Sequence, residues 1–171
     1  MNKQLEWDKT FLKIANTIAE QSKCQSVKVC AIAVKDNRII GTGINGSLPG
    51  AINCNEVFDK VTPENRLKHR EWSIKNEIHA EANLISEFAK TNRSISGSTV
   101  YINFSPCETC TRLLSRVGIK RIVYAELYDK GDISYTKAFF EKSKIELEHI
   151  SIEEGENNNN ERISYKNHQI S

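Results

Sequence analysis

The 171-residue chain has no long apolar run and no long block of charge of one sign. A membrane-spanning helix needs about 20 consecutive apolar residues, and a signal peptide needs a continuous apolar core. The N-terminal stretch MNKQLEWDKTFLKIANTIAE instead alternates charged and apolar residues. The sequence therefore predicts a cytoplasmic protein that has no membrane partner.

The excess of positive charge is also small, because 24 lysines and arginines face 22 aspartates and glutamates. Non-specific binding to nucleic acid depends on a strongly basic surface, so this balance argues against nucleic acid as a partner. A hydrophobic fraction of 39% and a charged fraction of 27% are typical of globular proteins and exclude a disordered or fibrous chain. A chain of this length is expected to fold as one domain.

The five cysteines are an odd number in a chain without a predicted secretion signal. Thiols stay reduced in the cytoplasm, so we expect no disulfide framework, and thiolates are free to bind metal. Cys30 lies in the apolar run VKVCAIAV and is expected to be a small buried core residue.

Apolar periodicity divides the chain into alternating helices and strands. The predicted helices cover residues 5–23, 77–90, 106–117 and 134–142, with a short one starting at Pro63. The predicted strands cover residues 27–34, 38–42, 98–104, 119–125 and 145–150. The first helix is expected to bury one stripe, which consists of Trp7, Phe11, Ile14, Ala15 and Ile18.

The order of these elements predicts the fold class. The turn-forming residues Lys35, Asp36 and Asn37 make the first two strands an antiparallel hairpin, whereas the later strand-helix-strand units favour parallel neighbours. We therefore expect an α/β protein, a three-layer α/β/α sandwich with a mixed central sheet of about five strands. Residues 1–150 form its single domain, and the Asn-rich residues 151–171 form a partly mobile tail.

Two segments place metal-ligating residues at the beginnings of predicted helices. EIHAEANL supplies His79 and Glu81, and SPCETC supplies Cys107 and Cys110. The cysteines are three apart, so in a first helical turn they lie on one face and can bind one zinc ion at about 2.3 Å. With His79 they make three ligands and leave a fourth tetrahedral position for water, as catalytic zinc sites do.

Glu81 is suited to proton transfer rather than to metal binding. It lies two residues after His79, which on a helix turns it about 200° around the axis, away from a shared metal. Zinc lowers the pKa of a bound water to about 7, and a neighbouring glutamate can take that proton and deliver it to a substrate nitrogen. These are the steps of a hydrolytic deamination.

Each of these features alone has a simpler interpretation. PCxxC can be half of a structural zinc ribbon, and His79 can be a surface histidine. HxE followed by PCxxC is, however, the signature of the zinc-dependent deaminases, which the chain resembles in both parts. The alternatives are a tRNA or DNA deaminase, which the near-neutral charge disfavours, and a non-catalytic zinc-binding protein, which has no use for Glu81.

The resemblance extends over about residues 10–145 to the deoxycytidylate (dCMP) deaminase family, especially its bacteriophage branch. The segments that carry it are SKCQSVKV, GTGINGSLPGAINC, HREWSIKNEIHAE, SPCETC and IVYAELYDKG. It implies a cytidine deaminase-like fold and hydrolysis of dCMP to dUMP and ammonia in nucleotide biosynthesis. It also implies a homohexamer that dCTP activates and dTTP inhibits, in the host cytoplasm if a phage encodes it.

The resemblance assigns roles to individual residues. It gives the zinc ligands and the proton shuttle as His79, Cys107, Cys110 and Glu81. It matches Ser26 and Lys28 to the substrate phosphate, Asn45 to the nucleoside and Tyr128 to the sugar and base. A phosphate needs a cation, which Lys28 can supply, although a solvated lysine at a strand edge is the simpler interpretation.

The turn Asn45-Gly46-Ser47 resembles the family's effector loop, and Lys90 matches a basic position linked to the effector response. We expect magnesium to accompany the triphosphate effector. A solvated charge at a helix end is the simpler interpretation of Lys90. The chain departs from the family pattern at Ile44, where a tyrosine is usual.

A second zinc site is implied at Cys24, Cys54 and His69, which match the structural zinc ligands of the phage enzymes. Glu77 matches a weaker or water-mediated fourth partner there. Independently, the loop over residues 44–76 has too few apolar residues to pack by itself, and a metal would hold it. The simpler alternative is two small buried thiols and a surface histidine.

Overall fold

The computed structural model describes residues 3–128 and 132–152. These residues form a five-stranded sheet in the order β2-β1-β5-β6-β7. Its strands are β1 (Cys30–Lys35), β2 (Arg38–Ile44), β5 (Thr99–Phe104), β6 (Arg121–Glu126) and β7 (Glu146–His149). β1 is antiparallel to β2 and β5, whereas β5, β6 and β7 are parallel. The predicted mixed sheet of about five strands is therefore confirmed. Most of the predicted tail, residues 153–171, lies outside the described residues.

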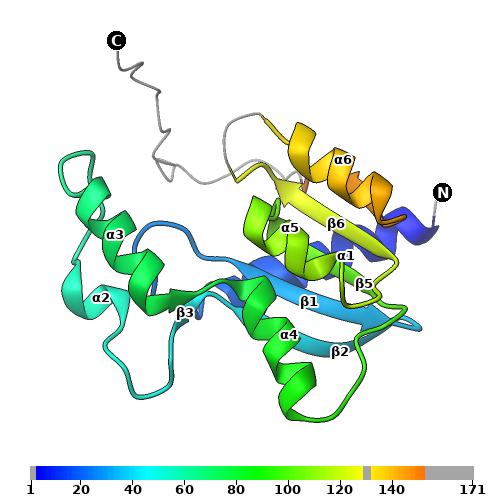
Figure 1. The fold of residues 1–171 in the computed structure, drawn as a ribbon, viewed down its shortest axis with the longest axis horizontal. Helices are drawn as coiled ribbons and strands as arrows, with labels where there is room; N and C mark the ends of the chain where they lie inside the picture. The colour runs from blue at the N-terminus through cyan, green and yellow to red at the C-terminus, as the bar shows by residue number, and fades with distance from the viewer. Residues whose placement is uncertain (1–2, 129–131, 153–171) are drawn as a thin grey trace.

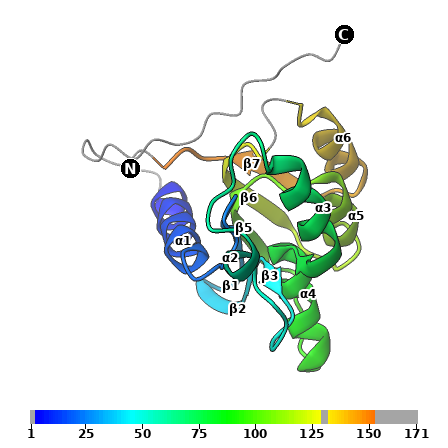
Figure 2. The same cartoon turned by 90° about the vertical axis from the view of Figure 1, so that its left-hand side faces the viewer.

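Helices cover both faces of the sheet and complete the three layers (Figures 1 and 2). α1 (Lys3–Ala19) packs on one face, around Leu12. The other face is covered by α4 (Ala80–Lys90), α5 (Glu108–Leu114) and α6 (Ser134–Lys142). Parallel strands need long crossover connections, which α5 and α6 provide between β5, β6 and β7.

The first helix differs from its prediction in its ends and in its buried stripe. It covers Lys3–Ala19 rather than residues 5–23, and Trp7 is 38% exposed. Trp7 stacks on Phe11 with ring centroids 5.5 Å apart, so it covers the edge of the core instead of entering it. Leu12, which the predicted stripe omitted, is fully buried.

A buried ion pair fixes α1 on the sheet. Asp8 accepts two hydrogen bonds from the Arg121 guanidinium, both at 2.8 Å, and one from the Tyr101 hydroxyl at 2.6 Å. Burial alone would raise the pKa of Asp8, but these hydrogen bonds lower it overall. The carboxylate therefore stays charged although it is almost fully buried.

The predicted hairpin is present, but its first strand starts later than expected. Asp36 and Asn37 form the two-residue turn at φ of 51° and 57°. β1 begins at Cys30, which is fully buried as predicted, and residues 27–29 belong to no strand. Side chains of Asn45 and Asn103 hold the backbone of residues 27–29, together with one backbone hydrogen bond from the Asn45 N–H to the Val29 carbonyl at 3.1 Å.

The segment over residues 44–76 is more regular than the loop we predicted. β3 (Gly46–Ser47) pairs antiparallel with β4 (Glu77–Ile78), and the chain between them forms α2 (Cys54–Val57) and α3 (Arg66–Asn76). Phe58 packs edge-on against His69 and Trp72, so the segment has a small core of its own beside the sheet (Figure 1). α3 begins three residues after Pro63, where the sequence predicted a short helix.

No helix of the described residues is long and apolar enough to span a membrane.

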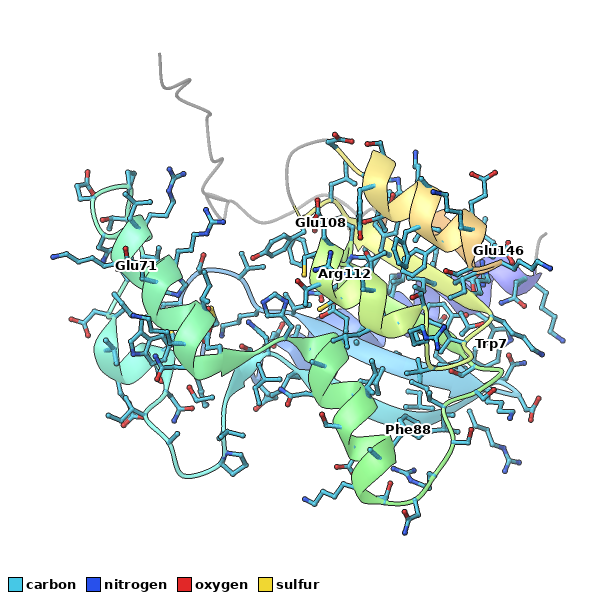
Figure 3. The ribbon with its side chains drawn as sticks, viewed as in Figure 1. Trp7, Glu71, Phe88, Glu108, Arg112 and Glu146 are labelled. Atoms are coloured by element: carbon cyan, nitrogen blue, oxygen red, sulfur yellow. The ribbon has the colours of Figure 1, made fainter. Side chains whose placement is uncertain are left out.

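Two glycines let α4 lie directly on β2. A Cβ atom on Gly43 would lie 2.3 Å from the Ala80 carbonyl oxygen and 2.4 Å from the Leu84 nitrogen. A Cβ atom on Gly41 would lie 2.6 Å from the ring of Phe88, which is labelled on α4 in Figure 3. α4 begins at Ala80 rather than at the predicted residue 77, because residues 77 and 78 pair with β3.

Candidate functional site

The residues that precede α4 and α5 bring the first cluster of metal-ligating side chains together. His79 is the N-cap of α4 and Cys107 is the N-cap of α5, and both have an extended backbone. Nδ1 of His79 lies 3.5 Å from Sγ of Cys107 and 3.4 Å from Sγ of Cys110. The three ligand atoms lie within 4.8 Å of one another, which suits one tetrahedral ion.

The ionisation of the cluster also suits zinc. Hydrogen bonding between the two thiols lowers the pKa of Cys107 to about 4 and raises that of Cys110. A thiolate is therefore available at neutral pH, and zinc binds thiolate and imidazole ligands. α5 is helical only over Glu108–Leu114, shorter than the predicted residues 106–117, because Cys107 caps it.

Glu81 lies one residue inside α4 and is 4% exposed. Burial raises the pKa of its carboxyl group, which hydrogen-bonds with the Cys110 thiol. Its oxygens are not among the ligand atoms that lie within 4.8 Å of one another. The helical angle used to separate Glu81 from His79 does not apply, because His79 precedes the helix.

The second cluster brings Cys24, Cys54 and His69 together, and all three are buried. Nε2 of His69 lies 3.3 Å from Sγ of Cys54 and 3.8 Å from Sγ of Cys24. Burial lowers the pKa of His69 and raises that of Cys24 to about 12. His69 is thus not the surface residue of the simpler alternative, and its imidazole is neutral, as a metal ligand requires.

Glu77 stands beside this second cluster. Burial is the main cause that raises the pKa of Cys24 and Cys54, and the charge of Glu77 adds to it; for His69 the same charge opposes burial, which lowers the pKa overall. Its Oε2 accepts a hydrogen bond from the Ser73 hydroxyl at 2.5 Å, whereas its buried Oε1 has no hydrogen-bond partner among the described residues. Buried polar atoms are nearly always paired, so this oxygen marks a place where a ligand fits.

The residues matched to the substrate lie at the end of the sheet where β1 begins and β2, β5 and β6 end. Lys28 is exposed, and its Nζ donates to the Glu20 carbonyl at 3.2 Å. Ser26 is exposed as well, and Tyr128 is 50% exposed and packs edge-on against Phe104. The Asn45 side chain is bound to the backbone of residues 27 and 29.

The residues matched to the effector loop line a cavity of about 710 Å³. Asn45, Gly46 and Ser47 continue the wall that β2 forms, and Lys23 and Arg93 bring positive charge to the cavity. Lys90 is exposed at the end of α4 and does not line this cavity.

Comparison with known proteins decides the family. Residues 5–126 match the family model described as the cytidine and deoxycytidylate deaminase zinc-binding region. The chain belongs to the cytidine and deoxycytidylate deaminase family. The family resemblance predicted from the HxE and PCxxC segments is confirmed.

Bacteriophage proteins are among the similar members of this family. The deoxycytidylate deaminases of Enterobacteria phages T2 and T4 are each 38% identical over 152 residues, which cover 71% of this chain and 81% and 79% of theirs. The crystal structure of the dCMP deaminase from cyanophage S-TIM5 in complex with dCMP and dUMP is 28% identical. It matches with a TM-score of 0.68 over 88% of this chain and 99% of that chain, which confirms the predicted fold.

Sequence reasoning missed the polar residues that hold the loops of this family's site. Nδ2 of Asn83 donates to the Ile44 carbonyl at 2.7 Å, and the Ser22 hydroxyl donates to the Asn45 carbonyl at 2.8 Å. Asn83 follows His79 by one helical turn, so its spacing in HAEAN was a readable signal. Ser22 carries no such signal, because it stands at no helical spacing from His79, Cys107 or Cys110.

Proposed function

We propose that this chain is a zinc-dependent hydrolase that converts dCMP and water to dUMP and ammonia. The observation that carries the proposal is the convergence of His79, Cys107 and Cys110 beside the buried carboxyl group of Glu81. Zinc held by these three residues would lower the pKa of a water molecule and activate it for attack on C4 of cytosine. The net charge of +2 gives no support to a polynucleotide substrate.

Glu81 carries the protons of this reaction. Its carboxylate takes one proton from the attacking water and gives it to ring nitrogen N3 as the C4–O bond forms. It then takes the remaining hydroxyl proton and gives it to the amino group, which leaves as ammonia when the C4–N bond breaks. Burial raises the pKa of Glu81, which helps the carboxyl group to hold a proton between the two transfers.

Ammonia release from dCMP, CMP, deoxycytidine and dCTP tests the reaction and its substrate. We expect dCMP to be preferred over deoxycytidine by at least about 10²-fold in kcat/KM, because donors arranged for a phosphate stay unpaired without it. Chelation should abolish the activity, and added zinc should restore it. Equal use of deoxycytidine and dCMP would indicate a nucleoside deaminase, and activity without metal would contradict the proposal.

Four residues place the substrate in this proposal. Ser26 and Lys28 meet the phosphate, and both are exposed at the surface, where a nucleotide can reach them. Asn45 meets the nucleoside and Tyr128 the sugar and base. The half-exposed ring of Tyr128 lies next to Phe104, three residues before Cys107, which is consistent with a place near the reacting base.

We also propose a structural zinc at Cys24, Cys54 and His69, with Glu77 as the fourth partner. Three buried nitrogen and sulfur donors and the unpaired Oε1 of Glu77 support it. The metal would join the chain before β1 to α2 and α3, and so hold the segment over residues 44–76.

Metal content tests the structural zinc. The wild type should bind about two zinc ions per chain and Cys54→Ser about one, with a lower Tm, because a metal that binds only the folded state stabilises it. Cys30→Ala removes another buried thiol that lies in neither cluster and should keep both ions. A wild-type content of one ion would rule the second site out.

We also propose that a nucleoside triphosphate regulates the enzyme. The cavity lined by Asn45, Gly46 and Ser47 would take a nucleoside triphosphate with magnesium, with Lys23 and Arg93 near the phosphates and Lys90 in the response. dCTP would activate and dTTP inhibit. Pairing of β3 with β4 links Gly46 and Ser47 directly to the residues that precede His79. We further propose a homohexamer in the cytoplasm, which is the host cytoplasm for a phage protein.

A further inference from the structure

Two asparagine side chains hold the backbone of residues 27–30 from its two sides. Oδ1 of Asn45 accepts the Val29 N–H at 2.9 Å, and its Nδ2 donates to the Val27 carbonyl at 2.9 Å. Oδ1 of Asn103 accepts the Cys30 N–H at 2.8 Å, and its Nδ2 donates to the Lys28 carbonyl at 2.9 Å. Nδ2 of Asn103 also lies 3.4 Å from Oδ1 of Asn16 in α1.

On the Asn103 side a carboxamide takes the place of a strand partner, whereas on the other side the Asn45 backbone N–H also donates to the Val29 carbonyl at 3.1 Å. In an extended chain the N–H and C=O groups of alternate residues point to opposite sides, and a carboxamide offers the same donor and acceptor as a peptide. Asn45 therefore serves residues 27 and 29, and Asn103 serves residues 28 and 30. We call these four hydrogen bonds of the Asn45 and Asn103 side chains the clamp. The clamp holds the extended backbone of residues 27–29 in place although these residues belong to no strand.

Asn103 connects residues 27–30 to the part of the molecule that holds the cluster of His79, Cys107 and Cys110. It is 3% exposed near the end of β5, a strand that pairs with β1 on one side and β6 on the other. Cys107 follows it by only four residues. One central strand thus sets the position of Lys28 relative to the cluster of His79, Cys107 and Cys110.

We propose that Asn103 is a positioning residue for recognition of the substrate phosphate, acting through the backbone of residues 28 and 30. The inference rests on the proposed function, in which Ser26 and Lys28 meet the phosphate. Asn103 touches neither substrate nor metal ligand in this proposal. Its loss would free the segment that carries the phosphate contacts and leave the reacting groups in place.

Kinetics on dCMP and deoxycytidine test the proposal in the zinc-loaded protein. Asn103→Ala should raise KM for dCMP about tenfold or more with little change in kcat, because misplacement of binding groups weakens the substrate complex. Its kcat/KM on deoxycytidine should change less than about twofold, so the preference for the phosphate falls. Asn103→Asp keeps the acceptor for the Cys30 N–H but places an oxygen, instead of an N–H donor, against the Lys28 backbone carbonyl. This variant should therefore also raise KM for dCMP.

Tyr101→Phe is the matched control, because it removes another buried hydrogen bond from β5, the one to Asp8 at 2.6 Å. It should lower Tm and leave the ratio of the two kcat/KM values unchanged. An unchanged ratio in folded Asn103→Ala, with a wild type that prefers dCMP, would overturn the role of Asn103 alone. A wild type without that preference would contradict the proposed phosphate site itself.

Hydrogen exchange on the wild type tests the clamp if the variants do not fold. The amides of Val29 and Cys30 should exchange slowly, as amides of a strand do, because Asn45 and Asn103 accept their hydrogens. Exchange as fast as in an unpaired loop would overturn the proposal.

Discussion

Glu81→Ala should keep zinc at the catalytic cluster and lose turnover of dCMP by about 10² to 10⁴-fold, the effect of removing one general acid-base group. Zinc should remain, because the three converging ligand atoms come from His79, Cys107 and Cys110. The measurement is kcat for ammonia release together with metal content per chain. Because the carboxyl group of Glu81 is buried beside the cluster, bulk water cannot take over its proton transfers.

Glu108→Gln is the control for this prediction. Glu108 lies in the first turn of α5, directly after Cys107, but its side chain is 68% exposed (Figure 3). Its loss removes a carboxylate near the same metal ligands without touching the buried side of the cluster, so turnover should stay close to that of the wild type. Near-normal turnover of Glu81→Ala would remove Glu81 from the mechanism.

Gly43→Ala should destabilise the protein by about 3 kcal/mol or more, at the upper end of the range for overpacked cores. The added methyl group would lie 2.3 Å from the Ala80 carbonyl oxygen and 2.4 Å from the Leu84 nitrogen. Both are backbone atoms of α4, so the whole helix must move away from β2. Because Ala80 follows His79 and precedes Glu81, activity should fall as well. Denaturant unfolding and ammonia release measure the two effects.

Gly41→Ala provides the comparison on the same strand. Its methyl group would meet ring atoms of Phe88 at 2.6 and 2.9 Å, and a side-chain ring can shift where a helix backbone cannot. We expect a smaller loss of stability, about 1 to 2 kcal/mol, and activity close to that of the wild type. Equal effects of the two substitutions would show that α4 adapts to β2 more easily than the contact at Gly43 indicates.

The apolar periodicity of the chain predicted most helices and strands. It failed where side-chain hydrogen bonds or very short elements determine the backbone conformation. Residues 27–29 read as strand because two of them are valines, yet the side chains of Asn45 and Asn103 and the Asn45 backbone N–H hold them. Apart from the short helix predicted at Pro63, residues 44–76 read as loop, because α2 and β3 are too short to show a period and α3 buries His69 alone. Trp7 fits the helical stripe but covers the edge of the core, where it stays 38% exposed.

The sequence by itself determined the chemistry of this protein. HxE and PCxxC are short, local patterns that together form the signature of the zinc-dependent deaminases, so the sequence predicts His79, Glu81, Cys107 and Cys110 as a set. The strand and helix order determined the mixed sheet in the same way. The family resemblance implied the group of Cys24, Cys54, His69 and Glu77, but only the tertiary structure buries the first three side chains together and leaves Oε1 of Glu77 buried without a partner among the described residues. Only the tertiary structure sets Asn103 against the backbone of Lys28. These contacts join residues far apart in the chain, and which distant groups meet depends on how the layers pack rather than on any local pattern.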